Sequence, residues 1–264
     1  MSSTNAIDLD DPRLEPYRDL RAGAGGDSFI VEGTLAVERL LTSARFEVES
    51  LVCTPSARAR LDPLLPAELP VYVLEKAALA TLAGFDFHRG VLACVRRPPP
   101  QTELDPALLA TLRARPRLTV VMAVGLADPR NLGAIVRNAA AFAVDLLIAD
   151  RHGADLFARQ TARTSVGNVF RLPTLVAEDV VGTIEALRRE LGLRVLAATP
   201  GGEQVLGRFA RPDRLLVLLG NEGQGLSDAL LAEADMRVQI PVDPASDSLN
   251  VAAAAAVLLF GLGA

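Results

Sequence analysis

The sequence predicts an α/β protein in two parts, of which the second carries a parallel sheet flanked by helices. Half of the 264 residues are apolar and 22% are charged, a composition typical of folded globular chains and unlike that of disordered or collagen-like ones. Short continuous apolar runs alternate with amphipathic helical patterns, as expected for strands that helices cover on both faces. Three consecutive prolines at 98–100 interrupt any helix or strand and separate the two parts.

The first part is expected to be a smaller α/β domain over residues 28–97. Apolar runs predict strands, and one amphipathic pattern predicts a helix, at the following positions: strands 29–31, 48–53, 71–74 and 90–95, and helix 35–41. Residues 1–27 are polar and glycine-rich near their end, so we expect an N-terminal extension that is partly mobile. Residues 98–116 are interpreted as a proline-rich linker.

The second part, residues 117–264, repeats strand and helix more regularly. The expected elements are strands 118–124, 145–149, 193–198, 215–219 and 237–240, a weaker strand at 169–172, and helices 132–142, 155–164, 179–191 and 251–264. The last segment is apolar throughout but shorter than the roughly 18–20 residues that cross a bilayer, so it predicts a buried helix and no membrane span.

Ligands of parallel sheets bind outside the carboxyl ends of the strands. A site is therefore expected in the loops that follow Val124, Ala198, Leu219 and Ile240.

The net charge of −5, from 27 basic and 32 acidic residues, excludes a protein that binds nucleic acid over its whole surface. The charge is uneven, however. Residues 113–171 hold nine basic and four acidic residues, while the segments on either side each sum to −5. Arg130 and Arg137 flank the start of a predicted helix, where a phosphate would meet both guanidinium and backbone donors. The alternative interpretation is a solvated face.

Two cysteines, Cys53 and Cys94, are too few for a disulfide scaffold, and with His88 and His152 they match no metal-binding spacing. We therefore expect no metal and a reducing, cytoplasmic location, and the polar N-terminus does not resemble a signal peptide. Cys94 lies in an apolar run and is expected to be a buried thiol. The stretch 85–89 either contacts RNA or belongs to the core.

Three of the expected loops carry polar residues that a connection alone does not need. The first contains Asn131 and Arg137 after a helix start at Asp128, and the second has the spacing GxxGxG from Gly220. That spacing is not the dinucleotide fingerprint GxGxxG, which disfavours an oxidoreductase of the Rossmann type. The third contains Ser248, a natural helix cap, and Asn250, an amide that needs partners if it is buried.

Together these loops resemble the three ordered motifs of the SpoU (TrmH-type) RNA ribose 2′-O-methyltransferases of the SPOUT superfamily. The matching residues are Asn131 to Arg137, then the stretch 219–227 with Gly220 and Glu222, then Ile240–Pro241 followed by 248–252. The upstream stretches 29–33 and 87–93 are similar to the ribosomal-protein-like substrate-binding domain that many members carry.

The resemblance implies an α/β knot, the SPOUT trefoil knot, with an S-adenosylmethionine pocket lined by Gly220, Ile240 and Leu249 and by main-chain groups near Thr199. It also implies a homodimer with the site at its interface, no metal and no membrane, and the following catalytic residues: Asn131, Arg137, Glu222, Ser248 and Asn250. A guanidinium has a pKa above about 12, so Arg137 is expected to hold a phosphate and orient the hydroxyl, and the proton acceptor stays unassigned.

The implied partner is structured RNA, with the added N-terminal domain favouring ribosomal RNA. Two alternatives stay open: a tRNA 2′-O-methyltransferase and a catalytically silent RNA-binding module of the same fold. The sequence departs from the family pattern at Asn138 and Ala143, and near Ser248 it contains Pro244 and Asp247 and no glycine. These departures leave the catalytic set intact.

Overall fold

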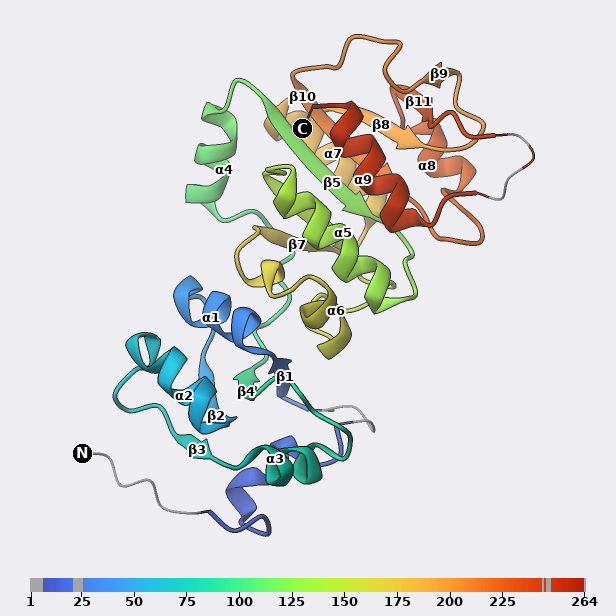
Figure 1. The fold of residues 1–264 in the computed structure, drawn as a ribbon. Coiled ribbons are helices and arrows are strands. Elements are labelled where there is room, and N and C mark those ends of the chain that lie inside the picture. Colours follow the sequence, from blue (N-terminus) through green and yellow to red (C-terminus); the bar gives the residue numbers. More distant parts are fainter. Residues whose placement is uncertain (1–6, 21–25, 244, 246–247, 264) are drawn as a thin grey trace. The chain divides into compact units, whose positions relative to one another are not determined.

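The computed structural model describes residues 7–20, 26–243, 245 and 248–263. They form two compact units, each with its own sheet (Figure 1). The first unit comprises the described residues up to Pro99 together with Phe157–Arg171, and the second comprises Pro100–Leu156 and the chain from Leu172 onward. The units therefore interleave along the sequence, which differs from the contiguous boundaries that the sequence suggested.

The segment before residue 28 belongs to the first unit's core wherever the structure describes it. We expected residues 1–27 to be a partly mobile extension, and the stretches 1–6 and 21–25 lie outside the described residues. Between them stands the 3-10 helix η1 (Pro12–Tyr17). Tyr17 is fully buried, and this burial raises the pKa of its hydroxyl. The described part of the segment is thus packed, because its few apolar side chains complete the core beneath the sheet.

The first unit is built on a four-stranded sheet with the order β1-β4-β2-β3. Strand β4 is antiparallel to both β1 and β2, whereas β3 runs parallel to β2. All four predicted strands and the predicted helix are present. The elements are β1 (Ser28–Glu32), α1 (Thr34–Ser43), β2 (Val48–Cys53), α2 (Pro55–Leu61), η2 (Asp62–Leu64), β3 (Val71–Val73), α3 (Lys76–Ala83) and β4 (Val91–Arg96).

Four aromatic rings join the segment Phe157–Arg171 to the rest of the first unit. Phe157 and Phe170 stack on Phe29 with ring centroids 5.3 and 6.3 Å apart. Phe46 meets the same two rings edge-on, at 5.4 and 5.2 Å. Stacked and edge-on geometries are the favourable ones for aromatic pairs, so this cluster holds the segment in the unit.

The strand predicted at 169–172 is wrong. The chain there forms η3 (Asn168–Phe170), preceded by α6 (Arg159–Thr164). The apolar run suggested a strand, but its Phe170 side chain packs in the aromatic cluster instead. The strand follows a few residues later, as β7 (Thr174–Ala177) in the second unit.

The second unit is built on a seven-stranded sheet with the order β7-β6-β5-β10-β8-β11-β9, in which every pair is parallel. This confirms the predicted parallel sheet. Every side chain of β5 and β6 is buried, which explains why they read as continuous apolar runs. The strands are β5 (Leu118–Ala123), β6 (Leu146–Asp150), β7, β8 (Arg194–Ala198), β9 (Gln204–Val205), β10 (Arg214–Leu219) and β11 (Met236–Gln239).

Helices cover both faces of this sheet. Side chains from α4, α7 and α8 share one hydrophobic cluster with one face of the strands, and α5 and α9 lie side by side (Figure 1). The bounds are α4 (Pro106–Ala114), α5 (Pro129–Ala141), α7 (Val180–Leu191), α8 (Asp228–Ala232) and α9 (Val251–Gly261). The stretch 98–116 is therefore not only a linker, because α4 begins at its cap Asp105 and buries Leu112 in the cluster.

Helix α9 is buried on one side only. Ala255, Leu258 and Leu259 are buried, whereas Phe260 is 77% exposed. The expectation of a buried helix is therefore correct only for the side that faces the rest of the unit. Because every residue of the helix is apolar, the sequence could not indicate which side is exposed. No helix in the described residues is long and apolar enough to span a membrane.

We predict that Gly167→Ala destabilises the first unit by more than the cost of its left-handed backbone alone, because the new side chain also collides with a neighbour. Gly167 has φ +75°, and a Cβ there would lie 2.7 Å from the Ala36 Cα. Left-handed backbone costs a non-glycine residue about 1–2 kcal/mol, and overpacking adds about 1–3 kcal/mol. The matched control is Gly192→Ala, which has φ +62° and no atom within 4 Å. Urea unfolding measures the loss in unfolding free energy for each variant. An equal loss in Gly167→Ala and Gly192→Ala would contradict the packing argument.

Candidate active site

The four loops at which the sequence predicted a site follow four neighbouring strands. Strands β5, β10, β8 and β11 are consecutive in the sheet and all parallel, so their carboxyl ends meet at one edge. The chain runs outward from β5 through β6 to β7 on one side, and β10 begins the other side. The boundary between β5 and β10 is thus the point where the strand order reverses, which is where open parallel sheets bind ligands.

Asn221 organises the loop after β10. Its side-chain amide donates to the Gly125 carbonyl over 2.7 Å, which joins this loop to the one after β5. Its Oδ1 accepts from the backbone N–H groups of Gly223 and Gln224, at 2.8 and 3.1 Å. A Cβ at Gly220 would lie 2.5 Å from the Gly225 carbonyl carbon. The loop needs a glycine at position 220 because any side chain there would collide with the backbone of Gly225.

Three of the five predicted catalytic residues are joined by hydrogen bonds. Asn131 on α5 donates from Nδ2 to Glu222 Oε1 over 2.6 Å. Asn250 donates from Nδ2 to Asn131 Oδ1 over 3.1 Å and accepts at Oδ1 from the Ala252 N–H, so it caps α9. The two bonds to Asn131 fix the orientation of its amide. An ionised Glu222 carboxylate keeps a second oxygen for a ligand.

The other two predicted residues, Arg137 and Ser248, are not brought into this network. Arg137 is exposed and lies six positions after Asn131, about 120° around the helix. Ser248 is exposed, and Asn250 takes the capping role that the sequence suggested for Ser248. In the described part of the chain, no hydrogen bond joins either residue to Asn131, Glu222 or Asn250.

Arg130 does not extend the site either, because it is held by the helix cap. The Asp128 carboxylate accepts from both the side chain and the backbone N–H of Arg130. These bonds lower the pKa of the Asp128 carboxyl, the side-chain bond contributing most. The sequence placed both arginines at the start of this helix, but α5 begins at Pro129, so only Arg130 lies in its first turn. Arg137 lies in the second half of α5 and is exposed.

The predicted cofactor residues lie at the same edge of the sheet. The Thr199 N–H donates to the Val238 carbonyl over 3.0 Å, which ties the loop after β8 to β11. Ile240 is half-buried and Leu249 is exposed. Apolar side chains beside backbone polar groups suit a ligand with a flat apolar face and polar edges. Pro244 and Asp247, which depart from the family pattern, lie outside the described residues.

Sequence reasoning assigned no role to two residues that hold the site together. One is Asn221, and the other is Asn138, whose Nδ2 donates to the Ala252 carbonyl over 2.8 Å. Asn138 and Asn131 are seven positions apart and share a face of α5. Asn221 lies just after the end of β10, so a search for amides at strand ends would have found it, whereas Asn138 lies within α5 and only its place beside Arg137 in the first motif marks it.

The remaining predictions concern thiols and metals. Cys53 and Cys94 are buried free cysteines, and burial raises their pKa values to about 11 and about 12. Both thiols are therefore protonated at neutral pH and are poor nucleophiles. Within the described ranges, no three His, Cys, Asp or Glu side chains gather as metal ligands, and the expectation that the enzyme needs no metal stays a prediction.

Comparison with known proteins places this architecture beside RNA-modifying enzymes. Residues 118–260 match the model of the SpoU rRNA Methylase family. A tRNA/rRNA methyltransferase of Mycobacterium bovis is 37% identical, over 97% of this chain and 90% of that protein. A solved RNA 2′-O ribose methyltransferase is 28% identical with a TM-score of 0.76, covering 97% and 96%. The AdoMet-bound rRNA methyltransferase of Sinorhizobium meliloti is 25% identical with a TM-score of 0.76, covering 97% and 95%.

We predict that Asn221→Ala loosens the loop after β10. The backbone N–H groups of Gly223 and Gln224 lose their acceptor, so their hydrogen exchange should accelerate. Asn221→Asp is the matched variant, because a carboxylate keeps both acceptor bonds and loses only the donor to the Gly125 carbonyl. Amide exchange measured by mass spectrometry distinguishes the two variants. Unchanged exchange at Gly223 and Gln224 in Asn221→Ala would refute this organising role.

Proposed function

The chain belongs to the SpoU rRNA methylase family, and on this premise we propose that it transfers the methyl group of S-adenosylmethionine to a ribose 2′-hydroxyl of ribosomal RNA. The observation that carries the proposal is the network of Asn131, Glu222 and Asn250 at the point where the strand order reverses. Three polar side chains from three separate segments converge there. A module that only bound RNA would not need such a set.

The edge of the sheet fits the cofactor in the chemistry of its groups. Ile240 and Leu249 offer apolar surface, while the loops at Thr199 and Gly220 offer backbone donors and acceptors close to it. We assign these four residues to S-adenosylmethionine, which supplies an already activated sulfonium methyl group. The bound cofactor in the Sinorhizobium meliloti structure supports this assignment.

The chain's own groups then have to place the 2′-oxygen in line with the methyl group and exclude water. Asn131, with both ends of its amide fixed, offers a rigid contact for a ribose or base edge. Glu222 supplies the carboxylate of the network. The guanidinium of Arg137 offers a fork of donors that suits phosphate oxygens, so we assign it to a phosphate of the target nucleotide, with the role of orienting the hydroxyl. Ser248 is assigned to the same site from its place in the third motif.

We further propose a homodimer with the site at its interface. Arg137 lies off the face of α5 that carries Asn131, so a second copy is the simplest source of the arginine that one chain does not bring to its own network. The exposed Val257 and Phe260 of α9 support an interface there, and the Phe142 ring of the neighbouring α5 lies 6.3 Å from that of Phe260. Large apolar side chains on an outer helix face are typical of protein interfaces.

Ribosomal RNA is the substrate that the first unit favours. The Sinorhizobium meliloti protein, described as an rRNA methyltransferase, aligns with this chain over nearly its whole length, including the first unit. A cytoplasmic location follows from an RNA substrate and free cysteines. Mapping of 2′-O-methylated riboses in ribosomal and transfer RNA from cells with and without the gene identifies the substrate. A missing methyl group in tRNA alone would overturn the rRNA assignment.

We predict that Arg137→Ala lowers methyl transfer at least about a hundredfold, because the target hydroxyl loses its alignment. The assay follows labelled methyl groups from S-adenosylmethionine into unmodified rRNA transcripts, with 2′-O-methylnucleosides identified by mass spectrometry. Arg130→Ala is the control, since it removes the same charge from the same helix at a side chain already paired with Asp128. Calorimetry should find unchanged cofactor affinity in both variants. Full activity in Arg137→Ala would contradict its role, and a wild-type protein that binds no cofactor would contradict the function.

We predict that Phe260→Glu separates the dimer into monomers, because a charge on the outer face of α9 cannot be buried without a partner. Leu64→Glu is the control, as Leu64 is an exposed apolar residue of the first unit and not of α9. Analytical ultracentrifugation distinguishes the two outcomes. A Phe260→Glu protein that stays dimeric, or a wild-type protein that is monomeric, would refute the interface.

A further inference from the structure

A single buried carboxylate in the first unit is surrounded by three arginines. The Glu32 side chain is 1% exposed. Arg159 reaches Glu32 Oε2 at 2.9 Å, Arg163 reaches Oε1 at 3.1 Å, and Arg89 lies 3.9 Å from Oε1. We call these three side chains the Glu32 arginine cluster. A buried carboxylate needs such partners, because an unpaired charge in the interior is strongly destabilising.

The cluster is more positive than its buried carboxylate requires. One carboxylate balances one guanidinium, so two positive charges are left on the surface around it. Other arginines of this unit are paired one to one: Arg58 with Asp62 and Arg60 with Glu38 on or beside α2. The segment 157–171 that supplies two members of the cluster contains three arginines and no acidic residue. Within the first unit, the surplus charge therefore comes from the positively charged segment 157–171, while the N-terminal part of the chain that forms the rest of the unit is acidic overall.

The three arginines differ in how they are held. Arg159 is 21% exposed, and its guanidinium also lies over the Phe85 ring, 5.3 Å from the centroid. Arg89 and Arg163 are 45% and 41% exposed. Arg159 thus anchors the carboxylate. Arg163 lies within hydrogen-bond distance of it and Arg89 at the distance of a longer ion pair, and both side chains stay substantially exposed. A guanidinium held in place loses little conformational freedom when it binds a phosphate, and its fork suits phosphate oxygens.

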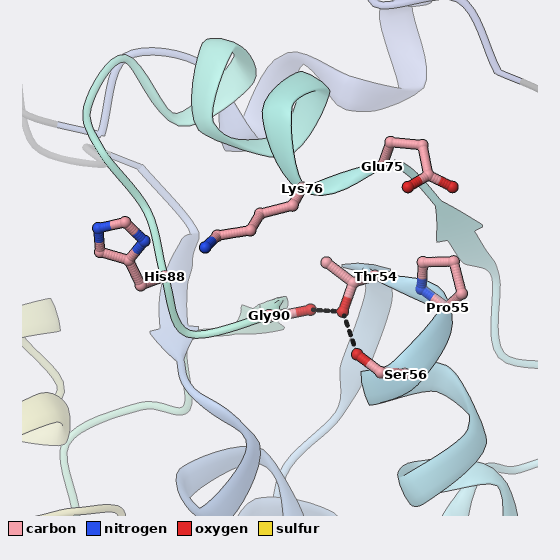
Figure 2. Close-up of a pocket in the computed structure, with 7 residues that line it drawn as sticks. All are labelled: Thr54, Pro55, Ser56, Glu75, Lys76, His88 and Gly90. Atoms are coloured by element: carbon pink, nitrogen blue, oxygen red, sulfur yellow. Dashed lines mark hydrogen bonds between the residues drawn. The ribbon is translucent and has the colours of Figure 1, made fainter.

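The loop that carries Arg89 also borders a hollow in the surface. His88 and Gly90, on either side of Arg89, line a pocket of about 380 Å³ together with Thr54 and Lys76. Figure 2 shows the Lys76 side chain extending toward His88. Lys76 is the only lysine of the chain. Glu75 also lines this pocket, so the pocket carries charges of both signs and the surplus of positive charge belongs to the Glu32 arginine cluster.

We propose that Arg89 and Arg163, positioned by Glu32 and Arg159, bind backbone phosphates of the substrate RNA. The inference rests on the proposed function in taking RNA as the substrate, and it assigns part of the RNA affinity to the first unit and to α6. Phosphate contacts position an RNA without reading its sequence, so the cluster sets affinity and leaves the choice of target to the rest of the protein.

The test compares the full-length protein with the double variant Arg89→Gln/Arg163→Gln, which leaves Arg159 to pair with Glu32. Filter binding with unmodified 16S and 23S rRNA transcripts is measured over a series of salt concentrations. Loss of two phosphate contacts should reduce the slope of log affinity against log salt by about 1.4–1.8. The affinity at about 0.1 M salt should fall about tenfold or more. Cofactor affinity, measured by calorimetry, should not change.

Two matched variants separate this role from general effects of charge and folding. Arg58→Gln/Arg60→Gln removes the same charge from the same unit at arginines that have their own carboxylates, and its RNA affinity should stay within about threefold of wild type. Arg89→Lys/Arg163→Lys keeps both charges, so it should keep the wild-type salt slope.

An unchanged slope and affinity in Arg89→Gln/Arg163→Gln would overturn the inference, and so would an equal loss in the Arg58/Arg60 control. Either result leaves the proposed function standing if the wild-type protein methylates RNA. Conversely, a protein that binds RNA through the cluster but transfers no methyl group refutes the proposed function and supports the inference.

Discussion

Strand β5 pairs with β10 over six residue positions, from Leu118 beside Arg214 to Ala123 beside Leu219. The pairing joins strands that are far apart in the sequence, and it places the end of one beside the end of the other. The hydrogen bond from the Val124 N–H to the Leu219 carbonyl continues it into the loops. Because the chain leaves β5 and β10 toward opposite sides of the sheet, a gap opens between their connections. The position of every residue in the candidate site depends on this pair.

Hydrogen bonds from amide side chains hold the loops of the candidate site in place. Asn221 closes the loop after β10 onto the loop after β5, Asn131 bridges α5 to that loop, and Asn250 ties the start of α9 to Asn131. An amide side chain both donates and accepts hydrogen bonds. A series of amides can therefore bond to one another and still leave donors or acceptors free for a ligand. The arrangement also separates two kinds of residue. Asn131, Glu222 and Asn250 are bonded to one another, whereas Arg137 is exposed on α5 and lies outside this network.

The first unit depends on a segment that the sequence places between β6 and β7. Phe157 and Phe170 complete an aromatic cluster with Phe29 and Phe46, and Arg159 and Arg163 pair with the buried Glu32. Without this segment, a carboxylate and two aromatic rings would be exposed or unpaired. The same segment gives the unit its surplus of fixed positive charge. Packing and the proposed RNA contact therefore come from one stretch of chain.

Local patterns in the sequence determined most of the elements. Apolar runs located nine of the described strands, since a strand buried on both faces must be apolar throughout, and missed β7 and the two-residue β9. The motifs also located Asn131, Glu222 and Asn250, because the loops that carry them resemble the ordered motifs of the family. The pattern failed at 169–172, where an apolar run served an aromatic cluster, and at 98–116, where α4 follows the prolines.

The amino-acid sequence alone was thus enough to predict the class of fold, the edge of the sheet with the candidate site and the family resemblance. Three features became visible only in the folded chain: Asn250 and not Ser248 caps α9, Asn221 joins two loops, and residues 157–171 belong to the first unit. The physical reason is distance along the chain. Propensity and periodicity report on neighbours within a few residues, whereas Asn131 meets Glu222 and Glu32 meets Arg159 across about ninety residues or more, through contacts that exist only once the sheets have formed.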